Sequence, residues 1–162
     1  LIPYFGGQKF GNSNENVKLT GIDIDNQAIE RARDNHKIMS SHSVTEFVMP
    51  PNIKFIAGDA THLEQYSEIP QTADVILIRH QQISDNPGLW SQIFDQALGR
   101  LGEGGVMILT SYSDYEHRML REALKQKGCQ IIIDEQNPYA TPLSDPRILI
   151  DHRVMIIRKM AK

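Results

Sequence analysis

Two aspartates follow short apolar runs and are well placed to bind a polar ligand. Asp23 directly ends one run, and Asp59 follows another after Gly58. A carboxylate at the end of a strand can accept both hydroxyl protons of a ribose in bidentate fashion. A second carboxylate can accept a hydrogen bond from an exocyclic amine, while the next backbone N–H, that of Ala60, donates to a ring nitrogen. In this order the pair matches a ribose site followed by an adenine site.

Each aspartate also has a plainer interpretation. Asp23 is equally an exposed turn residue, because short acidic side chains are common between a strand and a helix. The tripeptide at 58–60 is a weak motif by itself and also fits an ordinary turn, in which Gly58 permits close approach of the backbone. Asp25 is interpreted as the cap of the next helix and not as a ligand. The pairing of two such strand ends favours the ligand interpretation.

A basic pair follows the next apolar run. His80 is the candidate general base because histidine titrates near neutral pH, although a histidine at a strand end is more often a scaffold residue. Arg79 is expected to orient a carboxylate or phosphate, or to neutralise Asp23 or Asp59. The other histidines are His36, His42, His62, His117 and His152. They show neither the H-E-x-x-H spacing nor a partner cluster, so no metal site is predicted.

Repeated strand-then-helix units would position these residues. Runs of branched apolar residues alternate with segments of helical period, which predicts an α/β fold around a mostly parallel sheet. Strands are expected at 17–23, 53–57, 73–79, 106–110, 129–134 and 153–158, and helices at 26–39, at 87–101 and after an Asp114 cap. The nearly all-apolar run 73–79 predicts a central strand. The proline-rich loop before the last strand is too irregular for a crossover helix, so the final two strands should pair antiparallel.

Composition indicates one ordinary domain, residues 1–162, with 40% hydrophobic residues and a net charge of −3. The single cysteine, Cys129, cannot form an internal disulfide, so a reducing, cytoplasmic setting is expected. No apolar run reaches the ~18 residues that a membrane span needs. The slightly acidic balance argues against a nucleic-acid partner.

As a set, these segments resemble the class I S-adenosylmethionine-dependent methyltransferases. Residues 19–33 (LTGIDIDNQAIERAR) look like the family's second motif and 53–63 (IKFIAGDATHL) like its third, while 73–80 (ADVILIRH) and 101–109 (LGEGGVMIL) resemble its fourth and fifth strands. The resemblance covers roughly residues 15–160. It implies a Rossmann-like three-layer α/β/α sandwich with a C-terminal antiparallel strand pair. For S-adenosylmethionine it implies Asp23 at the ribose, Ile24 on the adenine ring, and Asp59 with Ala60 at the adenine edge. Gly58 and Arg79, taken from the residues themselves, complete the candidate cofactor-binding set.

The start of the chain departs from the family pattern. Members carry a first strand and a G-x-G-x-G loop, and Gly6, Gly7 and Gly11 do not substitute for that loop because no strand precedes them and their spacing differs. They do not form a phosphate loop either, since Asn12 stands at the position of the lysine. The missing strand and loop are therefore expected upstream of Leu1, and the chain is expected to be a domain truncated at its N-terminus.

The resemblance implies transfer of a methyl group from a sulfonium, in which alignment of the reactants supplies roughly 7–11 kcal/mol. The chain lacks the Asn-Pro-Pro-Tyr signature of amino-group methylation, and together with its negative charge this favours a small-molecule acceptor over nucleic acid. Two alternatives stay open. One is a non-catalytic methyltransferase-like module for binding or assembly. The other is a nicotinamide dehydrogenase, which would require G-x-G-x-x-G on its first strand.

Overall fold

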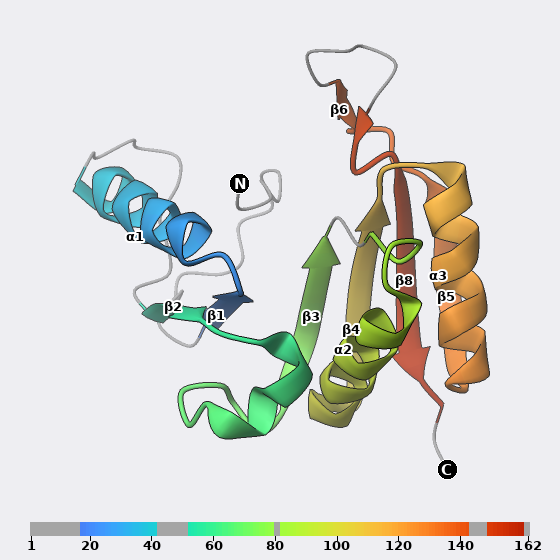
Figure 1. Ribbon diagram of the computed structural model, residues 1–162, viewed down its shortest axis with the longest axis horizontal. Coiled ribbons are helices and arrows are strands. Elements are labelled where there is room, and N and C mark those ends of the chain that lie inside the picture. The colour runs from blue at the N-terminus through green and yellow to red at the C-terminus, as the bar shows by residue number, and fades with distance from the viewer. Residues whose placement is uncertain (1–16, 42–51, 80–81, 143–148, 161–162) are drawn as a thin grey trace. The chain divides into compact units, whose positions relative to one another are not determined.

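The structure, a computed structural model, describes residues 17–41, 52–79, 82–142 and 149–160 (Figure 1). The chain divides into two compact units, residues 1–69 (unit 1) and residues 70–162 (unit 2). Each unit has its own strands and helices, and each is described by itself below.

Unit 1 is built on a parallel strand pair. β1 (Lys18–Asp23) pairs with β2 (Asn52–Ala57) in unbroken register, from Lys18 opposite Asn52 to Asp23 opposite Ala57. These are the first two predicted strands, within one residue at their starts. A short 3-10 helix, η2 (Ala60–Gln65), follows β2 directly and was not predicted.

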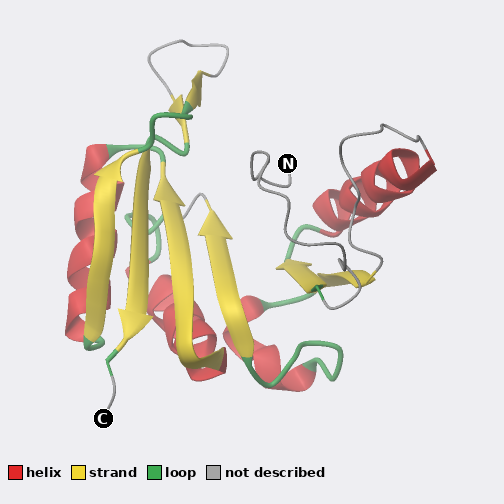
Figure 2. Ribbon diagram, turned by 180° about the vertical axis from the view of Figure 1, so that it is seen from behind, coloured by secondary structure: helices red, strands yellow, loops and turns green. Residues whose placement is uncertain are grey.

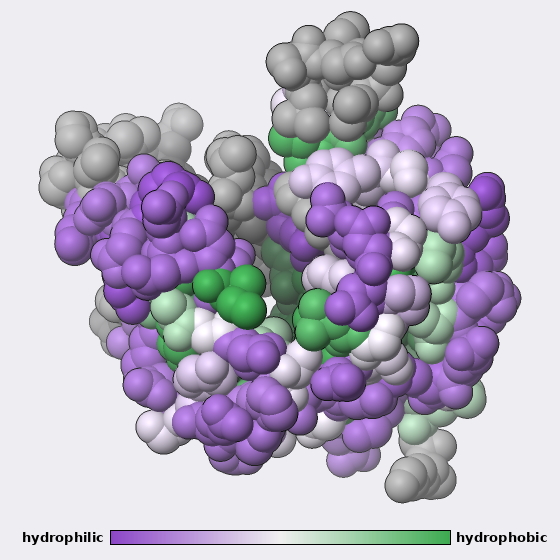
Figure 3. Space-filling model, in the orientation of Figure 1, coloured by the Kyte–Doolittle hydropathy of each residue, from purple (hydrophilic) through white to green (hydrophobic). Residues whose placement is uncertain are grey.

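A long amphipathic helix, α1 (Asn26–Ser41), follows β1. Ile29 is buried on its inner face, and Figure 3 shows hydrophilic side chains over its outer surface. Arg33 donates a hydrogen bond of 2.7 Å to the backbone oxygen of Phe55 and so joins α1 to β2. The predicted cap is confirmed, because Asp25 Oδ1 accepts a hydrogen bond of 2.8 Å from the N–H of Gln27.

Unit 2 contains a four-stranded sheet with the order β3-β4-β8-β5. Its elements in chain order are β3 (Ala73–Arg79), α2 (Pro87–Arg100), β4 (Leu101–Ser111), α3 (Asp114–Gln126), β5 (Cys129–Gln136), β6 (Thr141–Pro142), β7 (Leu149–Ile150) and β8 (Arg153–Lys159). β3 and β4 are parallel, whereas β8 is antiparallel to both β4 and β5. The predicted class, a Rossmann-like α/β fold with a mostly parallel sheet and a C-terminal antiparallel pair, is therefore confirmed.

The core of unit 2 lies between the sheet and its two helices. Figure 2 shows α2 and α3 behind the same face of the sheet. The most deeply buried apolar side chains come from both layers: Phe94, Met107, Leu109, Leu120, Leu124, Met155 and Ile157. α2 begins with an Asn86 cap and Pro87 at its first turn, as the fixed φ of proline favours.

Three details of unit 2 differ from the sequence predictions. The cap of α3 is Ser113, whose Oγ accepts the N–H of Glu116 at 3.2 Å, and Asp114 is the first helical residue. β4 starts at Leu101, directly after α2, because the glycine-rich segment 102–105 is part of the strand, where its pairing with β3 is irregular. β3 itself is an edge strand of the described four-stranded sheet, with Val75 55% exposed, although its apolar sequence predicted a central position.

Among the described helices, none is both long enough and apolar enough to cross a bilayer.

Candidate functional site

The parallel pairing of β1 and β2 brings the two predicted ligand-binding aspartates to the same edge of unit 1. Asp23 is the register partner of Ala57, and the N–H of Gly58 donates to the backbone oxygen of Asp23 at 2.9 Å. Asp59 is the next residue along the chain. The two carboxylates therefore belong to adjacent strand ends, as the sequence predicted.

The end of β1 presents one carboxylate and one apolar side chain to solvent. Asp23 is exposed, and its Oδ1 accepts the N–H of Asp25 at 2.8 Å. This local bond fixes the direction of the carboxylate. Ile24, between them, is 79% exposed, so it offers an apolar surface beside the carboxylate without contributing to the core. Such a pair suits a ligand with a hydroxylated part and a flat apolar part.

At the end of β2, the carboxylate of Asp59 is held by hydrogen bonds from one residue, Thr61. Asp59 Oδ1 accepts the backbone N–H of Thr61 at 2.8 Å and its Oγ1 at 2.7 Å. These two donors, the backbone one first, lower the pKa of the Asp59 carboxyl below its ordinary value. Within the described part of the chain both bonds fall on Oδ1, which leaves Oδ2 to accept from a ligand. Ala60 follows as the first residue of η2.

The close approach that the sequence predicted at Gly58 is made by a residue that it did not identify, Tyr66. A Cβ at this position would lie 2.5 Å from Cζ of Tyr66, so the tyrosine ring occupies the space beside the glycine. The Tyr66 hydroxyl also accepts the N–H of Asp59 at 2.8 Å. Sequence reasoning missed Tyr66 because the contact depends on η2, which is too short to show a periodic pattern.

Arg79, at the end of β3 in unit 2, is paired with a carboxylate that sequence reasoning also missed. Its Nε donates to Asp151 Oδ1 at 3.2 Å, a second guanidinium nitrogen donates to Asp151 Oδ2, and Thr110 Oγ1 donates to Oδ1. Asp151 has φ 56°, and no other non-glycine residue in the described ranges has a positive φ. The antiparallel return of β8 brings this residue to Arg79. His80, the predicted general base, lies outside the described residues.

A second charged cluster in unit 2 surrounds Asp134. Its Oδ1 lies 2.7 Å from Nε2 of His117, whose Nδ1 lies 3.0 Å from Oγ of Ser111. Arg121 and Arg153 approach the same carboxylate at 3.0 and 3.1 Å. Partial burial raises the pKa of Asp134, but His117, Arg153 and Arg121 together lower it below its ordinary value.

This order of serine, histidine and aspartate resembles a hydrolase triad, but Ser111 is 0% exposed and cannot reach a substrate. The cluster is therefore structural. The sequence alone did not indicate that Ser111 and Asp134 are the partners of His117. No group of three or more potential ligands in the described ranges is arranged to hold a metal ion.

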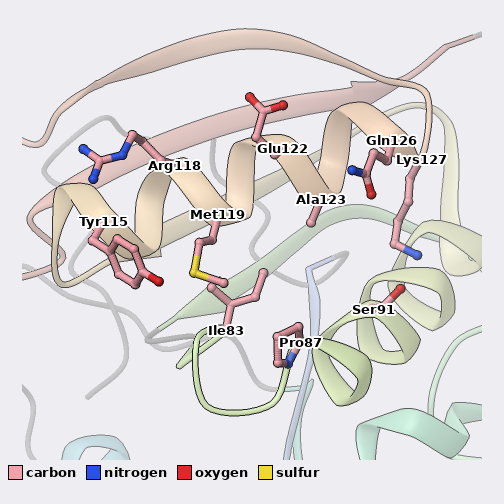
Figure 4. A pocket seen from close by; sticks show the side chains of 10 residues that line it. All are labelled: Ile83, Pro87, Ser91, Tyr115, Arg118, Met119, Glu122, Ala123, Gln126 and Lys127. Atoms are coloured by element: carbon pink, nitrogen blue, oxygen red, sulfur yellow. The ribbon is translucent and has the colours of Figure 1, made fainter.

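A groove of about 590 Å³ runs between α2 and α3 of unit 2 (Figure 4). Ile83, Pro87 and Met119 supply apolar lining, while Arg118 and Glu122 lie along α3 (Figure 4). None of the predicted site residues that the structure describes lines it.

Comparison with known proteins places the chain among methyltransferases. A family profile described as "Methyltransferase domain" matches residues 8–149. No curated protein matches the sequence.

Solved structures with the same fold include an rRNA methylase from Streptococcus thermophilus, with 14% identity, a TM-score of 0.60, and coverage of 89% of this chain and 74% of that one. A precorrin-6y C5,15-methyltransferase from Geobacter metallireducens has 19% identity, a TM-score of 0.62, and coverage of 90% and 69%. The N-methyltransferase NodS from Bradyrhizobium japonicum has 17% identity, a TM-score of 0.56, and coverage of 86% and 71%. These proteins are named for acceptors as different as rRNA and a precorrin, so at such identities the likeness shows the fold and leaves the acceptor open.

Proposed function

Because the chain belongs to the methyltransferase domain family, we propose that it binds S-adenosylmethionine at the ends of β1 and β2 and transfers its methyl group to a small-molecule acceptor. Membership of the family confirms the enzyme class predicted from the sequence, an S-adenosylmethionine-dependent methyltransferase. The family in general uses S-adenosylmethionine. We propose which residues of this chain hold it.

The observation that carries the proposal is the junction of the two strand ends. The hydrogen bond from Gly58 N–H to the backbone oxygen of Asp23 ties them together at 2.9 Å. In this arrangement the Asp23 carboxylate accepts the two ribose hydroxyl protons. Asp23 Oδ1 is already oriented by the N–H of Asp25, so the carboxylate is positioned before the ligand arrives.

The adenine ring would be held by the residues around the end of β2. Asp59 Oδ2 accepts from the exocyclic amine, and the N–H of Ala60 donates to a ring nitrogen. The hydrogen bonds from Thr61 that lower the pKa of the Asp59 carboxyl favour its charged form, which is the form that accepts from the amine. Ile24, which is 79% exposed, packs its side chain on the ring face. Gly58 contributes its backbone and leaves room for Tyr66.

Arg79, the last residue of β3, and His80, the next residue in the sequence, are proposed for the reactive side. S-adenosylmethionine supplies an activated methyl group on a sulfonium, with a thioether as its leaving group. Arg79, fixed by Asp151, orients a carboxylate of the ligand or acceptor. His80 takes the proton of an oxygen or protonated nitrogen acceptor. Alignment supplies most of the acceleration, roughly 7–11 kcal/mol in well-oriented reactions.

A small-molecule acceptor is supported by the net charge of −3 and by the missing Asn-Pro-Pro-Tyr motif. A structure named for a precorrin shares the fold, and so does one named for rRNA, so RNA is the competing acceptor class. The family match extends over residues 8–149 and includes parts of both units, which supports one methyltransferase domain over 1–162. The single Cys129 supports a reducing, cytoplasmic setting.

Calorimetric titration of the full-length protein with S-adenosylmethionine and S-adenosylhomocysteine tests the cofactor site. Asp23→Ala should weaken binding about ten-fold or more, because it removes hydrogen bonds to a charged group. Asp34→Ala is the matched control, since Asp34 is an exposed aspartate on α1 that pairs only with Lys37 at 3.3 Å among the described residues. Unchanged affinity in Asp23→Ala would refute the ribose role. Absence of saturable binding by the wild type would favour the non-catalytic module.

Transfer of a labelled methyl group then identifies the acceptor class. Small-molecule extracts and total RNA are offered separately to the wild-type protein. Label found in small molecules supports the proposal, whereas label found only in RNA would replace the proposed acceptor.

A further inference from the structure

Tyr66 contacts two successive residues at the end of β2. Its ring fills the space beside Gly58, where a Cβ would lie 2.5 Å from Cζ. Its hydroxyl accepts the N–H of Asp59 at 2.8 Å. The ring therefore sets the position of the backbone on one side of the turn, and the hydroxyl sets the orientation of the next peptide group.

These contacts complete the fixation of Asp59. The backbone is held through its N–H by Tyr66, and the side chain is held through Oδ1 by Thr61. Gly58 connects the same turn to Asp23 on β1. Each of these bonds leaves Asp59 Oδ2 unused, so the network restrains the carboxylate without occupying the atom assigned to the ligand.

We propose that Tyr66 is a positioning residue for adenine recognition, and that its hydroxyl sets the direction in which the Asp59 carboxylate meets the exocyclic amine. This inference rests on the proposed function of the site. Tyr66 acts through the backbone of Asp59 and need not touch the ligand. Its hydroxyl therefore affects the discrimination between bases as well as the affinity.

The base itself provides the decisive probe. In hypoxanthine a carbonyl oxygen replaces the exocyclic amine of adenine, so the Asp59 carboxylate meets an acceptor in place of a donor. A rigidly held carboxylate penalises this change strongly, because two acceptors face each other. A carboxylate released from its backbone restraint can turn away, and the penalty then falls.

The experiment compares S-adenosylhomocysteine with S-inosylhomocysteine in calorimetric titrations of the full-length protein. Tyr66→Phe keeps the ring beside Gly58 and removes only the hydroxyl. It should weaken binding of S-adenosylhomocysteine about five-fold and lower the preference over S-inosylhomocysteine. Tyr139→Phe is the matched control, because Tyr139 is 87% exposed, and it should leave both affinities unchanged. Asp59→Asn should weaken binding of S-adenosylhomocysteine and lower the preference further, with the contact of Ala60 N–H to the ring nitrogen still discriminating between the bases.

Three outcomes would overturn the inference. If Tyr66→Phe keeps the wild-type affinity and preference while Asp59→Asn lowers both, the adenine site is supported and the role of Tyr66 is refuted. If Tyr66→Phe weakens both ligands equally, the hydroxyl has only a structural role. If the wild-type protein binds neither ligand, the proposed function fails and this inference fails with it.

Discussion

Both units have aspartates at or near the ends of strands, but the two regions use them differently. In unit 1, Asp59 receives hydrogen bonds from the neutral donors of Thr61, and Asp23 is exposed. In unit 2, the side chain of Asp134 is 12% exposed. Three basic side chains approach it: His117, Arg121 and Arg153.

The pKa of the carboxyl group is lowered in both Asp59 and Asp134, yet the causes differ. At Asp59 the main causes are the two neutral donors of Thr61, with a smaller contribution from nearby His62, so most of its negative charge is left for a ligand. Basic groups compensate the charge of Asp134 within the fold. A lowered pKa is therefore a poor guide to a functional site by itself, and its physical cause separates a ligand-binding carboxylate from a structural one.

The largest expected effect is the loss of the Asp134 carboxylate. Asp134→Ala leaves His117, Arg121 and Arg153 without their common partner. Breaking a buried ion pair in this way costs about 3–5 kcal/mol, and the partial exposure of the two arginines places the expected loss at the lower end of that range. Chemical denaturation measures the free energy of unfolding.

The control for this substitution is Asp95→Ala. Asp95 also pairs with a cation, Lys127 at 2.6 Å, but its side chain is 65% exposed. Exposed pairs contribute about 0–1 kcal/mol, so this variant should unfold nearly as the wild type does. Equal losses of unfolding free energy in the two variants would mean that burial does not distinguish the ion pairs of Asp134 from that of Asp95.

A smaller effect is expected at the glycine of unit 1. Gly58→Ala places a Cβ against the Tyr66 ring, and moving the ring breaks its bond to the N–H of Asp59. Overpacking of this kind costs about 1–3 kcal/mol. Gly99→Ala is the control, since a Cβ there meets nothing within 4 Å and alanine favours a helix by about 1 kcal/mol. The two variants should shift the thermal midpoint in opposite directions, and a stabilised Gly58→Ala would remove the role given to Tyr66.

The fold class and most of the strand bounds could be predicted because they depend on local patterns. The apolar run at 73–79 coincides with β3, and the antiparallel pairing of β5 with β8 followed from the irregular loop between them. The two-residue strands β6 and β7 were missed because strands so short have no periodicity. The extension of β4 back to Leu101 was missed because it depends on pairing with β3.

The site could be predicted only where neighbouring strands bring residues together. Asp23 and Asp59 were expected at one edge because parallel strands end together. Asp151 was not predicted as the partner of Arg79, since 72 positions separate them and only the return of β8 joins them. His117 and Asp134 were likewise separated by 17 positions. Contacts of this kind follow from the tertiary fold and leave no local signal.

The smallest expected effect is on the pH dependence of stability. A carboxyl group whose pKa is lower in the folded protein than in the unfolded chain contributes stability above the unfolded value, about 3.9. As the pH falls, the unfolded chain takes up the proton first, so this contribution disappears as the pH falls through the folded pKa. Both Asp59 and Asp134 act in this direction. The wild type should therefore lose stability between about pH 5 and the folded pKa values.

Isosteric substitutions separate the two contributions to this loss. Asp134→Asn should flatten the acid limb of a plot of unfolding free energy against pH more than Asp59→Asn, because solvent screens the more exposed group. Urea denaturation at a series of pH values measures both slopes. If Asp59→Asn flattens the acid limb more than Asp134→Asn does, the comparison is reversed. The hydrogen bonds from neutral donors to Asp59 would then contribute more to folding than the basic cluster around Asp134.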